Sequence, residues 1–343
     1  MPELTGDSSA GWIDRRTIAK TAVGFAIAVV LVYLLGVGIG WDRTIDQLQT
    51  SQLEWVLAAC GSTVLCLIVW GKTWHVVLER IGISVPYRKL SVTFFAATFA
   101  NYVTPMGQAG GEPFIAYILA RDTEATYEQA LASVATTDLV RLLPFFTIGG
   151  LGLGYLLTTT QITGSIELFA IVLMALAVVL PFIAVVGWQF RDRLQRTVLR
   201  CIAPIAKRTD RITLDSIRDR IDRLYSSIEV IASSPRALLT AVAFAYIGWI
   251  LFALPLYFAS LALGTPISLL LVCFIVPISV IAGSVPLPGG LGAIEGALIV
   301  LLTTLTPSTT AIALAIATIY RLASYWLVIS VGGIAMLWVV KRV

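Results

Sequence analysis

The sequence predicts an all-α, polytopic membrane protein with six full spans and two re-entrant helical hairpins. Apolar residues make up 58% of the 343 residues and charged residues 13%, against roughly 45–50% and 25% in soluble domains. Apolar stretches of about 20 residues, the length that crosses a bilayer, recur along the chain. Two other apolar stretches are interrupted by Pro and Gly. A soluble enzyme and a nucleic-acid-binding protein are excluded, because a soluble fold would expose this apolar surface.

Six segments are expected to cross the membrane as single helices. The first follows Arg15, Arg16 and Lys20 and has no small-residue cleavage site, so it is expected to stay as an anchor. The six predicted spans are residues 21–40, 54–72, 129–157, 166–188, 237–263 and 310–340. We therefore divide the chain into a cytoplasmic N-terminal segment, 1–20, and a single transmembrane domain, 21–343.

Residues 89–120 and 267–305 are apolar but do not fit a simple span. The first is cut by NYVTPMGQAGGEP (101–113) and the second by VPLPGGLGAIE (285–295). Irregular backbone is tolerated at membrane depth only where protein or a cavity surrounds it. Each segment is therefore either two short full spans or a re-entrant helical hairpin. The apolar pieces are short for a span, which favours the hairpins.

The placement of charge predicts the orientation, since cytoplasmic loops carry excess Lys and Arg. Basic residues precede 21–40, follow 54–72 and close the chain at Lys341 and Arg342. Both termini are therefore expected in the cytoplasm of a plasma-membrane protein. Segment 89–120 then starts and ends inside, and 267–305 starts and ends outside.

The stretch 189–236 carries eleven Lys or Arg against six Asp or Glu, so it is also placed inside. Ile217, Ile221, Leu224 and Ile228 recur at helical spacing within it. We expect a cytoplasmic helical connector on the anionic leaflet. A docking site for a partner is the alternative.

The two halves of the chain predict an inverted repeat. Span 54–72, an inside hairpin and span 129–157 are followed by span 237–263, an outside hairpin and span 310–340. The Pro- and Gly-rich tips, residues 104–112 (the first tip) and 286–295 (the second tip), share an order of residue types. Inverted repeats with broken helices are typical of transporters.

Charged side chains beside these tips are the candidate substrate-binding residues. A charge at the bilayer centre costs roughly 2.5–3.5 kcal/mol on insertion scales, so each needs a partner, a proton or water. Asp138 and Arg141 lie three residues apart and can pair locally. Arg321 offers a fork that suits a phosphate oxygen. The alternative is a set of structural ion pairs that tie hairpins to spans. The candidates are Glu112, Asp138, Arg141, Glu295 and Arg321, with Gly110, Gly111, Gly289 and Gly290 allowing close approach to the backbone.

Other catalytic and metal chemistry finds little support in the sequence. His75 is the only His, and the four Cys are scattered without metal-ligand spacing. The chain has no Gly-x-Ser-x-Gly and no phosphate-binding Walker loop. We expect no enzymatic activity, no cofactor and no bound metal.

Three stretches resemble a known family. TPMGQAGGEPFIAYIL (104–119), PLPGGLGAIEGAL (286–298) and IYRLASYWLVISVGG (319–333) are similar to the lysylphosphatidylglycerol synthase transmembrane-region family. These flippase-like proteins are related to the N-terminal half of the multiple peptide resistance factor. The resemblance implies translocation of a polar lipid across the bilayer, with membrane lipids as substrate. The aminoacyl-transferring domain of the larger proteins is absent, so synthase activity is not implied.

Three alternatives to a lipid flippase remain open at the level of sequence. One is a membrane enzyme that acts on lipid-linked sugars or headgroups through Glu112 and Glu295. Another is an accessory subunit that docks through 189–236. The last is an ion-coupled carrier of small solutes. A homo-oligomer and a lipid-modifying enzyme are the partners to be considered; nucleic acid is not.

Overall fold

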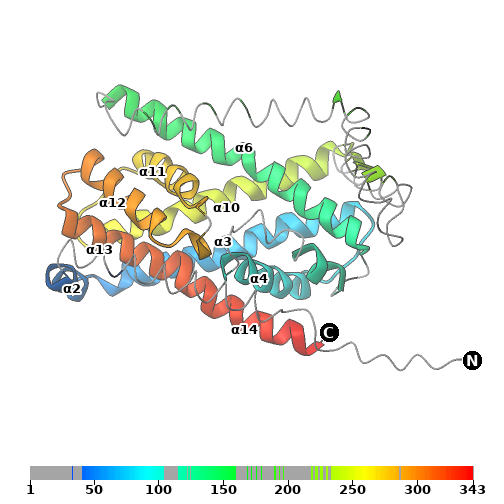
Figure 1. The fold of residues 1–343 in the computed structure, drawn as a ribbon, viewed down its shortest axis with the longest axis horizontal. Coiled ribbons are helices and arrows are strands. Elements are labelled where there is room, and N and C mark those ends of the chain that lie inside the picture. The colour runs from blue at the N-terminus through cyan, green and yellow to red at the C-terminus, as the bar shows by residue number, and fades with distance from the viewer. Residues whose placement is uncertain are drawn as a thin grey trace, which may run out of the picture.

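The computed structural model describes residues 41–103, 115–121, 125–159, 233–285 and 287–342, with isolated residues elsewhere, such as Tyr33 and Thr123. Every regular element in these ranges is helical (Figure 1). The predicted spans 21–40 and 166–188, the first tip (104–112) and the connector 189–236 lie outside the continuously described residues. For these segments the predictions stay predictions.

Four of the predicted spans are long helices. They are α3 (Leu53–Arg80), α6 (Tyr127–Thr159), α10 (Pro235–Ala262) and the succession of α13 (Thr310–Arg321), η2 (Leu322–Trp326) and α14 (Leu327–Arg342). The last three elements form one long rod that ends at the C-terminus (Figure 1). Pro235 starts α10 in its first turn, where a missing N–H costs nothing.

The two interrupted segments form shorter helices. The first contains α4 (Tyr87–Val103), and the second contains α11 (Leu269–Ala282), η1 (Pro288–Gly290) and α12 (Ala293–Leu305). The 14 residues of α11 extend about 21 Å, less than the roughly 30 Å of hydrocarbon. The sequence analysis missed one element. It predicted no helix between the spans 21–40 and 54–72, but the structure forms helix α2 (Trp41–Gln49) there.

The described helices include enough apolar length for a multi-pass membrane protein. Five stretches are long and apolar enough to cross a bilayer: α3, α6, α10, Pro288–Leu305 and Thr310–Val339. The fourth of these includes the turn η1, and its helix α12 has only 13 residues. The chain is an integral membrane protein with several transmembrane helices.

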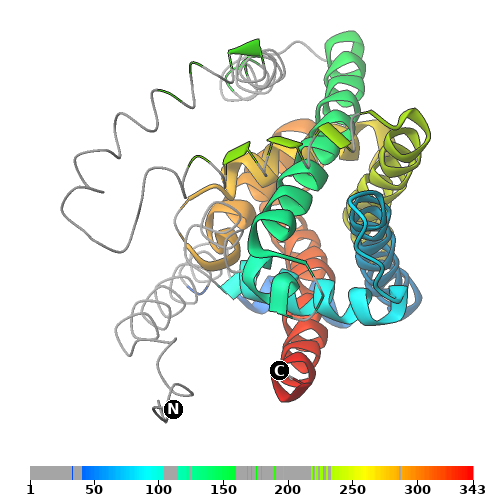
Figure 2. The same ribbon diagram turned by 90° about the vertical axis from the view of Figure 1, so that its right-hand side faces the viewer.

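The short helices α4 and α11, the predicted hairpin arms, each pack against a long helix from the other half of the chain. The longest contact joins α3 to α10, which lie side by side in both views (Figures 1 and 2). Arm α4 packs on α14 of the second half, and arm α11 packs on α6 of the first half. A Cβ added at Gly152 would overlap the backbone of α11, and one at Gly332 would overlap α4 at Phe95 and Phe99. Glycine therefore allows close approach at both contacts.

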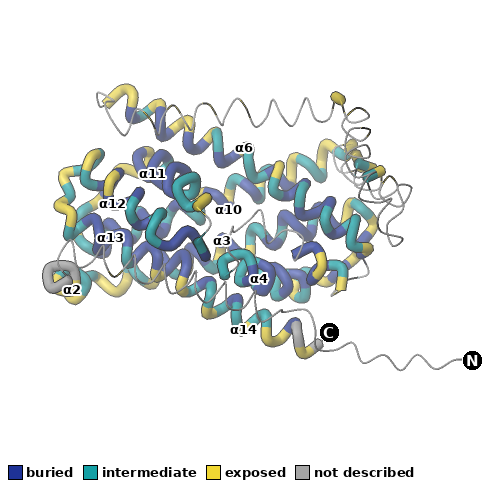
Figure 3. Tube along the Cα trace, in the orientation of Figure 1, coloured by how far each residue is buried: buried dark blue, intermediate teal, exposed yellow. Residues whose placement is uncertain are grey.

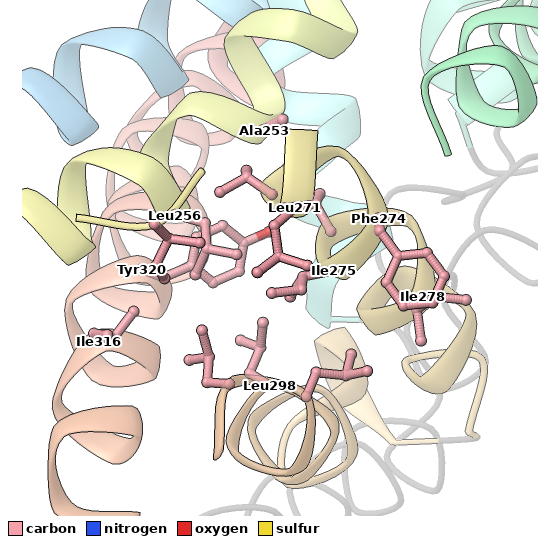
Figure 4. Close-up of a cluster of buried hydrophobic side chains, with 14 of the residues drawn as sticks. Ala253, Leu256, Leu271, Phe274, Ile275, Ile278, Leu298, Ile316 and Tyr320 are labelled. Atoms are coloured by element: carbon pink, nitrogen blue, oxygen red, sulfur yellow. The ribbon is translucent and has the colours of Figure 1, made fainter. Parts of the chain in front are cut away.

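The main core lies where α10, α11, α12 and α13 meet. Buried residues concentrate on the sides of these helices that face one another (Figure 3). Leu256, Ile275, Leu298, Ile316 and Tyr320 converge there from all four helices (Figure 4). This packing fixes the position of α12, whose N-terminal end carries Glu295.

Candidate functional site

The charged centre of the second half is an ion pair between Glu295 and Arg321. Nε of Arg321 donates to Oε1 of Glu295 over 2.7 Å, and both side chains are only 7% exposed. Glu295 belongs to the first turn of α12, and Arg321 is the last residue of α13. The pair therefore ties the hairpin to the following span, which is the structural alternative left open by the sequence.

The second tip supplies backbone groups that complete this pair. Oε2 of Glu295 accepts from the backbone N–H of Gly292 over 2.6 Å, which caps the start of α12. Nη2 of Arg321 donates to the carbonyl oxygen of Gly289 over 2.9 Å. Gly289 and Gly292 have φ of 57° and 84°, a region that favours glycine. The turn therefore presents one donor to the carboxylate and one acceptor to the guanidinium.

Tyr325 lies beneath this network and links it to the first half. The Arg321 guanidinium lies 4.4 Å from the centroid of the Tyr325 ring, and a Cβ at Gly289 would overlap the same ring. On its other side, Tyr325 stacks on Tyr102 with centroids 5.6 Å apart and planes at 15°. Tyr102 lies next to the end of α4, just before the first tip, and it packs against the buried cluster that Tyr325 forms with Leu291 of the second tip. The end of α4 and the second tip therefore meet at Tyr325.

Tyr325 belongs to a single turn of π-helix, η2, between α13 and α14. At the end of this turn the backbone N–H of Leu327 donates to the carbonyl oxygen of Leu322, five residues earlier. Such turns break the regular helical register and are frequent at functional sites. The turn begins directly after Arg321, so the rod changes register at the point where the second tip contacts it.

Arg141 is the corresponding charge in the first half, and its surroundings differ. Its guanidinium lies 4.7 Å from the centroid of Trp70 and 5.3 Å from that of Phe94. Nη1 is 3.5 Å from Oδ1 of Asp138, which confirms the predicted local pair, and Nη2 is 3.5 Å from the carbonyl of Trp70. Both contacts are at the outer limit for a hydrogen bond.

The aromatic residues around Arg141 come from three helices, α3, α4 and α10. Trp249 of α10 donates from Nε1 to the carbonyl oxygen of Arg141 over 3.0 Å, and its ring meets Trp70 edge-on at 6.0 Å. A Cβ at Gly248 would overlap the Trp70 ring, so glycine lets α10 approach α3 here. Trp74, one turn after Trp70, meets the Phe94 ring edge-on at 4.9 Å.

The predicted residues thus have three outcomes. Arg141 pairs weakly with Asp138, and Glu295 pairs closely with Arg321 beside Gly289. Gly290 is buried against the backbone of Gly283 and touches no charged group that the structure describes. Glu112, Gly110 and Gly111 lie outside the described residues.

Sequence reasoning missed the aromatic members of both sites. These are Trp70, Phe94, Tyr102, Trp249 and Tyr325. One signal was present, since Tyr325 follows Arg321 by four residues, the spacing of one helical turn. The other partners come from distant segments and had no local signal.

No metal site is found in the part of the chain that the structure describes. No group of three or more His, Cys, Asp or Glu side chains there could hold a metal ion. His75 approaches Lys72 through Nδ1 at 3.1 Å and Glu79 at 3.3 Å, a polar cluster near the end of α3. His75 therefore has charged neighbours of its own, and the described residues show no contact between it and Arg141 or Arg321.

Comparison with known proteins agrees with these features. The chain is 26% identical over 325 residues to a UPF0104 membrane protein of Methanothermobacter thermautotrophicus, covering 92% of this chain and 95% of the relative. It is 24% identical over 321 residues to the UPF0104 membrane protein PH1989 of Pyrococcus horikoshii, covering 91% and 95%. It is 24% identical over 333 residues to MJ1595 of Methanocaldococcus jannaschii, covering 95% and 96%. The profile of the lysylphosphatidylglycerol synthase transmembrane region matches residues 21–332, and the chain belongs to this family.

Proposed function

We propose that this protein moves a polar lipid from one leaflet of the bilayer to the other. The observation that carries the proposal is the meeting of the hairpin ends around a buried ion pair, with Tyr102, Tyr325 and Gly289 in contact. Membership of a transmembrane-region family named for a lipid synthase supports a lipid as the substrate. Charged groups inside a membrane protein are typical of a pathway for polar cargo.

The packing of the helices supports an inverted repeat with re-entrant hairpins. Exchanging the halves converts the contact of α4 with α14 into that of α11 with α6. Gly152 follows Arg141 by eleven residues, and Gly332 follows Arg321 by eleven, and each glycine faces the arm of the other half. The lengths of α11 and α12, 14 and 13 residues, suit arms that enter and leave on one side.

In this proposal the contact between the two hairpins opens during transport. A headgroup crosses beside the polar groups while the lipid tails stay in the bilayer, so the protein only has to shelter the headgroup. Alternating access in repeats of this kind moves one unit against the other. The stacking of Tyr102 on Tyr325 is then the closed state of the pathway.

The proposal includes the orientation inferred from charge. Both termini and the basic stretch 189–236 would face the cytoplasm across the plasma membrane. A membrane-impermeant thiol reagent applied to intact cells should not reach a Cys placed at position 210. Labelling of that position from outside would reverse the orientation.

Reconstitution tests the function directly. Purified protein is placed in liposomes that contain a fluorescent phospholipid, and dithionite then bleaches the probe in the outer leaflet. Translocation predicts that nearly all fluorescence is lost, against about half in protein-free vesicles. Mass spectrometry of the recovered lipids separates transport from enzymatic change. Chemically altered lipid would favour the enzyme instead, and a plateau at half would contradict translocation.

A further inference from the structure

We infer that Arg141, held between Trp70 and Phe94, is the binding contact for the phosphate of a lipid headgroup. This inference rests on the proposed function and assigns the substrate class, a phosphate-bearing lipid. It follows from a difference between the two arginines of the repeat. Arg321 gives its donors to protein groups, whereas Arg141 keeps one edge open.

The difference concerns the edge formed by Nε and Nη2, two parallel donors that can hold both oxygens of one anion. In Arg321, Nε donates to Glu295 over 2.7 Å and Nη2 to Gly289 over 2.9 Å. In Arg141, Nε has no hydrogen-bond partner among the described residues, and Nη2 reaches only the Trp70 carbonyl at 3.5 Å. The same edge is used in one half and open in the other.

Leaving this edge open is costly in a membrane interior. The Nε of Arg141 is buried away from solvent, and a buried donor without a partner costs about 1–3 kcal/mol, more for a charged group. Asp138 offsets part of the charge, but only through Nη1 and at 3.5 Å. A second anion that binds Nε and Nη2 during transport would offset this cost.

Aromatic packing aims the open edge. Trp70 and Phe94 lie 4.7 Å and 5.3 Å from the guanidinium carbon, and stacking of this kind holds the guanidinium plane while leaving its N–H groups free at the rim. Trp249 fixes the backbone of Arg141 through its indole N–H. The group is therefore positioned before any ligand arrives, which lowers the cost of binding.

Two further buried donors lie on α3, one helical turn after Trp70. Thr73 Oγ1 and Trp74 Nε1 are buried and make no hydrogen bond with the described residues. They follow Trp70, on which Arg141 stacks, by three and four residues. Both can donate, which suits the oxygens of a phosphate better than a cationic group.

The side chains of Arg141 and Asp138 are more exposed than the Glu295–Arg321 pair, although Nε of Arg141 is itself buried. The side chain of Arg141 is 16% exposed and that of Asp138 35%, against 7% for both members of the other pair. Leu139 and Leu143, which flank Arg141 on α6, are exposed apolar residues that suit lipid tails. A headgroup at Arg141 would then keep its acyl chains along the outside of α6.

Binding by the full-length protein in detergent tests the inference. The probes are phosphatidylglycerol, diacylglycerol with the same acyl chains, and inorganic phosphate, read by native mass spectrometry and by tryptophan fluorescence. We expect phosphatidylglycerol to bind better than diacylglycerol by about tenfold or more, the value of one charge-assisted hydrogen bond. Arg141→Gln should remove this preference, and Arg141→Lys should keep only part of it because a point charge lacks the paired donors.

Arg121→Gln is the matched control, since Arg121 is exposed and donates from Nη1 to the Tyr117 hydroxyl over 3.0 Å. It should bind phosphatidylglycerol like the wild type, and gel filtration should show all variants monodisperse. Equal binding by wild type and Arg141→Gln, or equal binding of diacylglycerol, overturns the inference. Inorganic phosphate binding as tightly as the lipid would overturn the lipid as the source of the phosphate.

The liposome assay separates this inference from the proposed function. If phosphatidylglycerol binds through Arg141 but no lipid moves, the site is retained and translocation is rejected. If lipid moves equally fast with Arg141→Gln, translocation is retained and the phosphate contact is rejected. Slower movement together with weaker binding supports both.

Discussion

Arg321 and Glu295 satisfy each other inside the helical bundle, with Nε and Oε1 2.7 Å apart and both side chains 7% exposed. The remaining carboxylate oxygen and Nη2 of the guanidinium are used by backbone groups of the second tip. Such a pair holds α12 against α13 and leaves little charge for a ligand, because each buried partner needs the other to offset the loss of its hydration. Four mutational predictions and one cross-linking test follow from this geometry and its surroundings.

Removing one member of the pair should destabilise the protein. Arg321→Met leaves a buried carboxylate and Glu295→Gln leaves a buried guanidinium without its charged partner, each costing about 3–5 kcal/mol. The double variant Glu295→Gln with Arg321→Met should recover most of the loss, since Gln still accepts from Gly292. Thermal unfolding in detergent measures this coupling. Strictly additive losses would show that the two side chains do not depend on each other.

Gly289→Ala should disturb the second tip through two effects. Its φ of 57° costs an alanine about 1–2 kcal/mol, and the new Cβ would overlap the Tyr325 ring. Gly264→Ala isolates the first effect, since Gly264 has φ of 66° and open space. Gly296→Ala has neither effect and should be neutral or stabilising in helix α12. The unfolding temperature should be lowest for Gly289→Ala, higher for Gly264→Ala and highest for Gly296→Ala. If Gly289→Ala is as stable as Gly264→Ala, the overlap with the Tyr325 ring does not occur.

Tyr325→Phe should be tolerated and Tyr325→Leu should not. The Tyr325 hydroxyl is buried without a hydrogen-bond partner in the described ranges, so its removal should change stability by about 1 kcal/mol or less. Leucine loses the stack on Tyr102 and the contact with Arg321, each worth about 0.5–1.5 kcal/mol. Thermal unfolding of the two variants gives the comparison. If both variants lose the same unfolding free energy, the Tyr325 hydroxyl itself contributes to stability, which would contradict this account.

Gly152→Ala and Gly332→Ala should weaken the two arm contacts to a similar degree. In both, the added Cβ would overlap the backbone of the facing arm, and overpacking of this kind costs about 1–3 kcal/mol. Gly154→Ala on α6 meets nothing within 4 Å and is the control. Unfolding in detergent should show two destabilised variants and one unchanged. A loss at only one of the two glycines would argue against equivalent arms.

The helices were predictable because apolar length and interruptions by Pro and Gly are local properties of the sequence. The spans expected at 129–157 and 237–263 differ from α6 and α10 by two residues at most at each end. The span expected at 54–72 is too short, since α3 continues to Arg80. A span was expected to need only about 20 residues, and the extra turns of α3 lie beyond that length.

The candidate site was only half predictable. Glu295, Arg321, Asp138 and Arg141 were identified because a charge in an apolar stretch needs an explanation. Which arginine is saturated depends on the backbone of Gly289 and on rings from other helices, and neither leaves a pattern in the sequence. The π-helical turn that contains Tyr325 likewise leaves no pattern in the sequence.

The central claim, that lipid passes between the hairpin ends, is tested most directly by a reversible cross-link. Tyr102 packs against the cluster of Leu291 and Tyr325, so Tyr102 and Leu291 are replaced by Cys in a chain whose four native Cys are removed. A short, reducible bis-thiol reagent then joins them in liposomes, with each single-Cys variant treated in parallel. We predict that linked protein stops moving fluorescent phospholipid and that reduction restores the rate. Movement at the full rate while the ends stay linked would contradict the account.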